Sequence, residues 1–274
     1  MSTSSRASGP GLAVVTGASS GIGEEFARQL AARGYNLLLT ARREQRLQAL
    51  ADVLRTKYGI GVGAMPLDLS KDSDVAILAE CISGSKDLAL LVNNAGFGTE
   101  GLFHVASLHE NLDMHKVHVL ATLTLSHAAL ENFERAPRAG TGIINVSSVA
   151  SFFASPSNVS YSASKAWITR FSEGLAAELA GRSSPIRVQA LCPGFTYSEF
   201  HDRIKMSRDP IPKQLWMTAE FVVAESLRGF DEGKLIVIPG WRYKALTMLI
   251  RLTPGALLRK IAAGLARRYR KPKV

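Results

Sequence analysis

The sequence predicts an α/β protein in which a doubly wound parallel sheet of about seven strands carries helices on both faces. Apolar runs of strand length alternate with longer segments of helical period. The runs are almost continuously apolar, as strands covered on both faces must be. The 274 residues, 46% of them hydrophobic, can bury one substantial core. We therefore expect a single domain followed by a basic helical tail.

The elements follow in order along the chain. The expected strands are Leu12–Thr16, Asn36–Ala41, Val62–Pro66, Leu88–Asn93, Thr141–Ser147, Ile186–Cys192 and Leu235–Pro239. The expected helices are Ile22–Arg33, Glu44–Lys57, Val75–Ser83, Leu108–Phe133, Val159–Ala180 and Thr218–Phe230, with Ala245–Leu252 and Ala256–Tyr269 in the tail. We predict a disordered N-terminal tail over residues 1–11, the folded domain over 12–241 and an amphipathic basic tail over 242–274.

Composition excludes several classes. The first eleven residues lack the apolar run of a secretory signal, and no run of about 18 apolar residues predicts a membrane span. Cys81 and Cys192 stand outside any Cys/His grouping, so we expect no metal site and a cytoplasmic protein. The net charge of +10 comes from ten bases in residues 242–274, where no acid occurs.

A glycine-rich turn follows the first strand and opens a helix, with the sequence Thr16, Gly17, Ala18, Ser19, Ser20, Gly21, Ile22, Gly23. Gly17 and Gly21 permit backbone shapes that other residues resist, and Gly23 lets helix and strand approach closely. The helix amino end offers free N–H groups to a pyrophosphate. By itself the motif is also compatible with a tight turn that binds nothing.

The end of the second strand predicts which dinucleotide binds there. An acid at this place would hold the ribose hydroxyls of NAD, but the chain has Arg42 and Arg43. Two guanidinium groups favour the 2′-phosphate of NADP. They are alternatively a solvated helix start, although bases at a helix amino end oppose its dipole unless an anion is near.

Two further strand ends belong to the predicted cofactor site. Asp68 and Leu69 follow the third strand and are placed to meet the adenine, with a helix cap as the alternative for Asp68. Asn94, Ala95 and Gly96 follow the fourth strand and are expected to line the cofactor trough.

Three residues predict acid–base chemistry. Tyr161 and Lys165 are four apart on one helix face, and Ser148 follows the fifth strand. Reduction of a carbonyl leaves an alkoxide that needs a proton, and a neighbouring ammonium would favour the tyrosinate form of a tyrosine whose free pKa is about 10. The Ser148 hydroxyl can bond the substrate oxygen. For Tyr161 and Lys165 alone, an ordinary helical face is the alternative.

Together these motifs resemble the classical short-chain dehydrogenase/reductase family. The resemblance covers residues 12 to about 240 and includes the glycine turn, Asn93–Gly96, Ser148, Tyr161–Lys165 and Pro193–Gly194. It implies a Rossmann-type sheet, a Ser/Tyr/Lys acid–base group, homodimers or homotetramers, and contact of Pro193, Gly194 and Thr196 with the nicotinamide amide. The arginine pair resembles the NADP-preferring members.

One position departs from the family pattern. Where the family commonly has an asparagine in a proton relay, this chain has His118. Histidine also bonds water and titrates near physiological pH, so a tuning role in catalysis is one reading. Packing in a helix bend is the other.

Two segments extend the prediction. Gly194–Met217 is long and aromatic and includes Ile204 and Met206, which suggests a lid over a hydrophobic carbonyl or alcohol substrate.

In the tail, Leu257, Leu258, Ile261 and Leu265 oppose Arg259, Lys260, Arg267 and Arg268. This pattern fits peripheral contact with an anionic membrane or packing on the body or a partner subunit. With few stacking aromatics, nucleic acid is not expected as a partner.

The leading functional hypothesis is an NADP(H)-dependent interconversion of a carbonyl and an alcohol, with Tyr161 as acid and base. The alternatives are a non-catalytic NADP sensor on the same fold and a dehydratase or epimerase.

Overall fold

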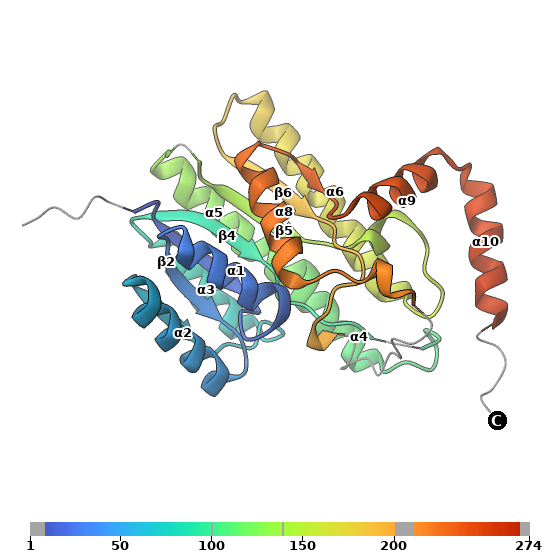
Figure 1. Ribbon diagram of the computed structural model, residues 1–274, viewed down its shortest axis with the longest axis horizontal. Helices are drawn as coiled ribbons and strands as arrows, with labels where there is room; N and C mark the ends of the chain where they lie inside the picture. Colours follow the sequence, from blue (N-terminus) through green and yellow to red (C-terminus); the bar gives the residue numbers. More distant parts are fainter. Residues whose placement is uncertain (1–8, 100, 139, 201–210, 269–274) are drawn as a thin grey trace, which may run out of the picture.

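Seven parallel strands form the centre of the protein. The computed structural model describes residues 9–99, 101–138, 140–200 and 211–268. The strand order is β3-β2-β1-β4-β5-β6-β7, so the chain begins in the middle of the sheet and winds outward in both directions (Figure 1). The strands are β1 (Leu12–Thr16), β2 (Asn36–Thr40), β3 (Val62–Met65), β4 (Leu88–Asn93), β5 (Gly142–Val146), β6 (Arg187–Leu191) and β7 (Ile236–Val237).

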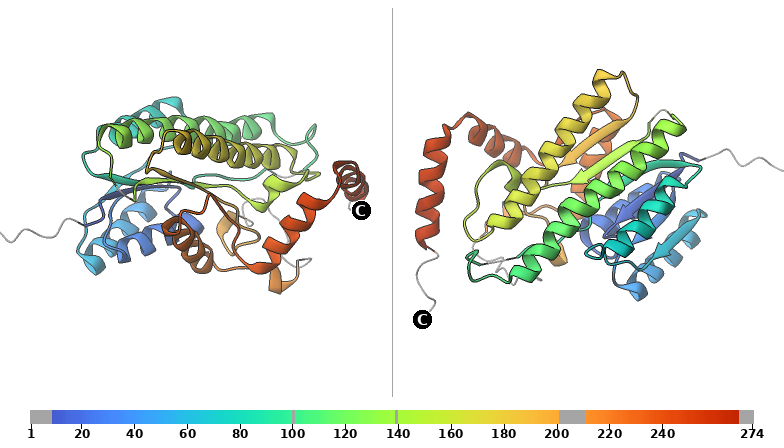
Figure 2. Two further views of the ribbon diagram at one scale, coloured as in Figure 1. Left: turned by 90° about the horizontal axis from the view of Figure 1, so that it is seen from above. Right: turned by 180° about the vertical axis from the view of Figure 1, so that it is seen from behind.

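Helices cover both faces of the sheet, as Figure 2 shows from above. One core cluster joins the sheet to α1 (Gly21–Ala32), α2 (Glu44–Tyr58) and α8 (Ala219–Asp231). The other joins it to α3 (Asp72–Ser83), α5 (Thr122–Arg135) and α6 (Val159–Gly181). Alternate residues of one strand supply the two cores: Ala13 and Val15 of β1 face the first cluster, whereas Val14 faces the second. This confirms the predicted doubly wound fold.

The predicted helix Leu108–Phe133 is interrupted. The structure has α4 (Leu108–His115), a π-helical turn η1 (Lys116–Ala121) and then α5. A π-turn inserts one extra residue per turn, which rotates the side chains that follow it, and such turns are frequent at functional sites. His118 lies in this turn and is completely buried.

The first helix of the predicted tail begins earlier than its expected start at Ala245 and packs on the body. Helix α9 (Trp241–Leu252) starts before the predicted boundary at residue 242, and its Tyr243 and Thr247 are buried. Helix α10 (Gly255–Arg268) follows and stands at the periphery of the molecule (Figures 1 and 2). Ile204, Met206, the side chains of Leu265, Arg267 and Arg268, and most of the predicted N-terminal tail fall outside the described residues.

Candidate active site

Ser148 and Tyr161 meet where β5 ends. Ser148 has an extended backbone and caps the short 3-10 helix η2 (Val149–Phe152), its Oγ accepting from the Ala150 N–H at 3.1 Å. The Ser148 side chain also hydrogen-bonds the Tyr161 hydroxyl. The predicted convergence of a strand end and a helix face is therefore present.

Ser147 fixes α6 against the sheet. Its backbone N–H donates to Leu191 O at 2.7 Å, and its Oγ donates to the carbonyl of Lys165 at 2.7 Å. The same Oγ lies 2.8 Å from Thr169 Oγ1. Because one residue bonds both β6 and α6, the helix is held in register with the end of β5. Sequence reasoning passed over Ser147, although its place beside Ser148 was a usable signal.

Lys165 is the buried base of the site. It is 5% exposed, its Nζ donates to Val146 O at 2.8 Å, and Nζ lies 5.8 Å from the Tyr161 ring centroid. Burial penalises the ammonium and lowers the pKa of Lys165 to about 7, with the nearby Cys192 opposing the shift. The side chain therefore changes charge near neutrality.

Tyr161 is a protonated phenol at neutral pH. Burial raises the pKa of Tyr161 to about 12, and the hydrogen bond with Ser148 works in the other direction. The Phe200 ring lies against it, with 5.5 Å between centroids. We expected the Lys165 ammonium to favour tyrosinate. In this structure desolvation is the larger cause and the Ser148 hydrogen bond is the opposing one, so the phenol keeps its proton at neutral pH.

His118 is a neutral hydrogen-bonding residue. Its Nδ1 lies 2.8 Å from Ser164 Oγ, and Ser164 Oγ donates its one proton to the Tyr161 carbonyl at 2.8 Å. Ser164 therefore accepts from His118, which assigns the proton to Nδ1. Burial, with the charges of Lys165 and His115, lowers the pKa of His118 well below its usual value. This direction favours a neutral ring over the reading in which His118 titrates near physiological pH.

The glycine turn and the end of β4 form one unit. Gly17 and Gly21 have φ of +67° and +57°, the left-handed region that favours glycine. Thr16 Oγ1 accepts from the N–H groups of Asn94 and Ala95, both at 2.9 Å, and Asn94 Nδ2 donates to Thr16 O at 2.8 Å.

Gly23 is required by space in the same unit. A β-carbon on Gly23 would lie 2.3 Å from Gly17 O and 2.4 Å from Asn94 Nδ2. The predicted close approach of helix and strand is thus present. Asn94, which follows the neighbouring strand β4, also contributes to it.

This unit fits a pyrophosphate. Helix α1 begins after Ser20, whose side chain makes no capping hydrogen bond. The first-turn N–H groups of an uncapped helix remain available, and the helix dipole favours an anion there. Ile22 packs against the first core cluster and so attaches the turn to the core.

The two arginines after β2 have different surroundings. Arg42 is exposed and forms no ion pair with any residue in the described ranges. Its positive charge nevertheless helps to lower the pKa of Asp68. Arg43 instead donates to Ser19 Oγ at 3.2 Å and to Glu199 Oε2 at 2.7 Å. Arg46 Nη1 bonds the other Glu199 oxygen at 2.5 Å. Two hydrogen bonds from these arginines, stronger than the opposing burial, lower the pKa of Glu199 to about 2.

Asp68 lies beside Arg42 rather than beside the acid–base group. Its Oδ1 accepts from the Ser70 N–H at 3.1 Å and from Ser70 Oγ at 2.9 Å. Burial tends to raise the pKa of Asp68, but the Ser70 bonds and the charges of Arg42 and Lys71 bring it below the usual value. Leu69 is buried in the second core cluster.

The segment after β6 is tied to the tail. A β-carbon on Gly194 would lie 2.1 Å from the Tyr243 ring, and Tyr243 Oη accepts from Phe195 N–H at 3.0 Å and donates to Leu215 O at 2.7 Å. Tyr243 thus fastens both ends of Gly194–Met217, which we call the substrate segment. Sequence reasoning did not single out Tyr243.

Pro193 and Thr196 are held at the start of the same segment. Pro193 O accepts from Val149 N–H at 3.0 Å, which joins the segment to η2 beside Ser148. Thr196 is 3% exposed, and its Oγ1 donates to Gly194 O at 3.0 Å. The predicted nicotinamide-side residues are therefore neighbours of the acid–base group.

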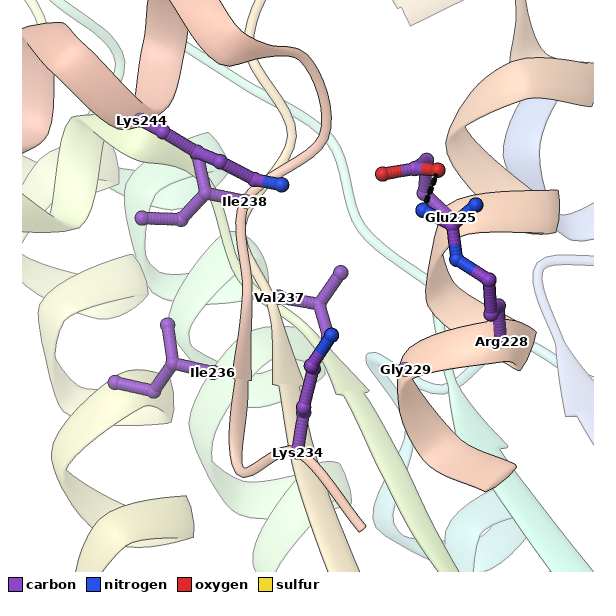
Figure 3. A pocket seen from close by; sticks show the side chains of 8 residues that line it. All are labelled: Glu225, Arg228, Gly229, Lys234, Ile236, Val237, Ile238 and Lys244. Carbon is purple, nitrogen blue, oxygen red and sulfur yellow. Dashed lines mark hydrogen bonds and ion pairs between the residues drawn. The ribbon is translucent and has the colours of Figure 1, made fainter. Parts of the chain in front are cut away.

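A separate hollow of about 280 Å³ lies between α8 and β7 (Figure 3). It is lined by Glu225, Arg228, Gly229, Lys234, Ile236, Val237, Ile238 and Lys244, with Glu225 and Arg228 paired. None of the predicted site residues lines it, so it contributes nothing to the arrangement around Tyr161.

Comparisons with known proteins agree with this fold. The family model for short chain dehydrogenases matches residues 11–209. A solved short-chain dehydrogenase from Sphingobium yanoikuyae in complex with NADPH is 31% identical, covers 90% of this chain and 97% of its own, and superimposes with a TM-score of 0.79.

Two curated relatives reduce 3-oxoacyl groups, according to their names. The very-long-chain 3-oxoacyl-CoA reductase of Laccaria bicolor is 36% identical over 73% of this chain and 59% of its own length, so this chain spans about three-fifths of that relative. The 3-oxoacyl-(acyl-carrier-protein) reductase of Aquifex aeolicus is 28% identical over 84% of this chain and 96% of its own.

Proposed function

The chain belongs to the short chain dehydrogenase family, and on that basis we propose that it is an NADP(H)-dependent oxidoreductase that interconverts a carbonyl and an alcohol on a hydrophobic substrate. The observation that carries the proposal is the geometry in which the Tyr161 hydroxyl is hydrogen-bonded to Ser148, with the buried Lys165 Nζ 5.8 Å from the Tyr161 ring centroid. This is the arrangement that delivers a proton to a developing alkoxide.

Each residue of the acid–base group has a separate role in the proposed reduction. When bound, the nicotinamide supplies the hydride. The Ser148 hydroxyl donates a hydrogen bond to the substrate oxygen, and Tyr161 gives its proton to that oxygen. The Lys165 ammonium, held by Val146 O, stabilises the negative charge that Tyr161 then carries. His118 positions the Tyr161 backbone through Ser164.

The substrate segment supports an apolar substrate. Phe200 lies against Tyr161, and Tyr197 stacks on Trp216 with 5.0 Å between centroids. Phe195 also packs against Trp216, with 5.4 Å between centroids. The named activities of the two curated relatives suggest a 3-oxoacyl thioester as the first substrate class to test.

NADP is the proposed cofactor because of Arg42. This guanidinium is exposed at the end of β2 and is not engaged by a carboxylate of the described chain, in contrast to Arg43. A charged hydrogen bond to a phosphate contributes roughly 1.5–3 kcal/mol, about ten- to a hundredfold in affinity.

The experiment measures NADPH and NADH binding, then oxidation of each with 3-oxoacyl thioesters and aromatic ketones of increasing size. We expect tight NADPH binding and stoichiometric NADPH consumption. In Arg42→Ala, NADPH affinity should fall by roughly tenfold or more while NADH affinity changes little. An unchanged affinity ratio would contradict the cofactor assignment.

Two other outcomes identify the alternatives. Cofactor binding without turnover across the whole panel would favour a non-catalytic sensor. Product formation without net NADPH consumption would favour a dehydratase or epimerase.

We also propose a homo-oligomer that uses the outer face of α6. Trp167 and Phe171 stack there with 4.8 Å between centroids, and both are partly exposed. Light scattering should give more than one chain mass for the wild type and a smaller mass for Trp167→Ser with Phe171→Ser. An unchanged mass would place the interface elsewhere.

A further inference from the structure

Helix α9 has a buried face and an exposed face of different chemistry. The buried face carries Tyr243 and Thr247, which are 4% and 3% exposed. Tyr243 is the residue that fastens both ends of the substrate segment. The inner face of α9 therefore packs on the body of the protein through these two residues.

The outer face is an apolar stripe. Trp241, Ala245, Met248 and Leu252 recur at intervals of four, three and four residues, which places them along one side of a helix. This side is opposite Tyr243 and Thr247. Trp241, Met248 and Leu252 are 69%, 64% and 73% exposed. Large apolar side chains that gather on one exposed stripe mark an interaction surface.

Bases border the stripe on both sides. The Arg242 guanidinium lies 4.8 Å from the Trp241 ring centroid on one side. Lys244 and Arg251 follow the other side, and Arg251 packs at 4.8 Å over the Phe152 ring of η2. Long basic side chains can keep their charge in a polar layer while their stems cover apolar surface.

The same chemistry continues on α10, which stands out from the body in Figures 1 and 2. Leu257 and Ile261 are 49% and 50% exposed, and Arg259 and Lys260 are exposed beside them. We call the outer faces of α9 and α10 the docking face.

The charge of the docking face indicates which kind of partner binds it. Residues 242–274 hold ten bases and no acid, whereas residues 1–241 hold 23 bases and 23 acids. The body of a second copy offers no net negative charge to meet this surface. An anionic bilayer offers both an apolar layer and a sheet of negative charge. We propose that the docking face binds the surface of an anionic membrane, with Trp241, Met248 and Leu252 inserted at the headgroup boundary.

Docking of this kind is peripheral. Among the residues described, no helix combines the length and apolar character needed to cross a bilayer. The apolar stripe lies parallel to the axis of α9, so the helix would rest in the plane of the interface.

The docking face is joined to the active site by two features. Tyr243 connects α9 to the substrate segment. A cavity of about 300 Å³ separates α10 from the start of α6 and is lined mainly by Ala154, Pro156, Val159 and Ala262. Val159 precedes Tyr161 by two residues. If the proposed oxidoreductase function holds, an apolar substrate leaving the bilayer would reach this side of the site first.

The test is sedimentation of the full chain with vesicles of phosphatidylserine and phosphatidylcholine, compared with phosphatidylcholine alone. The variant W241S/M248S/L252S removes the stripe, and R242Q/K244Q/R251Q removes the bordering charge. The matched control V53S/I77S removes exposed apolar side chains of α2 and α3, which are 50% and 46% exposed. A thermal melt and NADPH binding check that each variant is folded.

We expect the wild type and V53S/I77S to sediment equally with anionic vesicles, and both docking-face variants to bind roughly tenfold more weakly. Brominated lipid should quench the fluorescence of Trp241, and W241F should lose that quenching. Equal sedimentation of the wild type and the stripe variant would overturn the proposal. So would a stripe variant whose only change is a smaller oligomeric mass. Neither readout uses turnover, so failure here is distinct from failure of the proposed function.

Discussion

The Nε2 atom of His118 faces the α-carbon of Gly96 so closely that a β-carbon on Gly96 would lie 2.5 Å from it. Gly96 is therefore required by space and not by a special φ. His118 cannot retreat, because it is fully buried and its Nδ1 is bonded to Ser164. The contact joins the predicted cofactor trough after β4 to the π-turn behind Tyr161.

Substitution of Gly96 tests this contact. Gly96→Ala should destabilise the protein by roughly 1–3 kcal/mol, because overpacking of a rigid core forces its neighbours to move. His118→Ala in the same chain should recover part of that loss. Denaturant unfolding of both single variants and the double variant gives the coupling energy, which should exceed about 1 kcal/mol.

Gly174→Ala is the matched control. A β-carbon at this helical position meets nothing within 4 Å, so the change should be neutral or stabilise α6 by about 0.5–1 kcal/mol. Additive effects at Gly96 and His118 would mean that the two residues do not press on one another.

His118→Asn tests whether the histidine titrates during catalysis. Because burial keeps the pKa of His118 well below its usual value, the ring should stay neutral from weakly acidic to alkaline pH. The pH–rate curves of wild type and variant should have the same shape, even where the variant is slower. A step near pH 6.5, the usual value for histidine, that disappears in His118→Asn would refute the neutral role.

Lys165 should lower the stability of the folded protein in a pH-dependent way. Its pKa falls from 10.5 to about 7 on folding. The penalty on the ammonium is therefore full below about pH 7 and fades as the pH rises toward the unfolded value. The pKa shift corresponds to a penalty on the order of 5 kcal/mol. A substitution that removes the ammonium removes this penalty, but it also removes the hydrogen bond to Val146 O, which contributes about 1.5–3 kcal/mol.

Lys165→Met should consequently abolish activity and raise the melting temperature at and below neutral pH, with a gain that shrinks toward pH 10. Differential scanning calorimetry across pH measures this. Lys86→Met, at an exposed position, should show no such trend. A melting temperature that falls for Lys165→Met at all pH values would mean that the ammonium is stabilised by its surroundings.

Glu199 connects the substrate segment to the predicted phosphate site. Its carboxylate forms ion pairs with Arg43 Nη1 at 2.7 Å and with Arg46 Nη1 at 2.5 Å. Because its pKa is about 2, Glu199 is ionised at any working pH. Glu199→Gln should release the Arg43 guanidinium toward the 2′-phosphate. We expect NADPH to bind roughly three- to tenfold more tightly and NADH to bind as before.

Fluorescence titration with both cofactors measures the effect. Glu225→Gln breaks an ion pair in the hollow between α8 and β7 (Figure 3) and should change neither affinity, because none of the predicted site residues lines this hollow. A Glu199→Gln variant in which both cofactors change equally would mean that the ion pairs do not compete with the phosphate.

The sequence was sufficient for the sheet, because buried parallel strands and amphipathic helices have distinct local patterns. It also predicted the meeting of Ser148 with Tyr161, since strand ends share one edge of such a sheet. It did not predict the π-turn at Lys116–Ala121, because one inserted residue barely disturbs helical period. The pressing of His118 on Gly96 and the link of Glu199 to Arg43 join residues far apart in the chain, so no local pattern reports them.

The α9 boundary was missed for a related reason. Tyr243 lies among basic residues that read as a separate tail, but its ring fills the space beside Gly194. Only the three-dimensional contact shows that the first tail helix belongs to the body.

The central claim is that Tyr161 supplies the proton for carbonyl reduction. The most direct measurement is NADPH oxidation by Tyr161→Phe with a 3-oxoacyl thioester that the wild type reduces, together with NADPH binding by the same variant. We predict that kcat falls by about 10²–10⁴ while the Kd for NADPH stays within about twofold of the wild-type value. A Tyr161→Phe variant that binds NADPH normally and retains most of the wild-type kcat would contradict the claim.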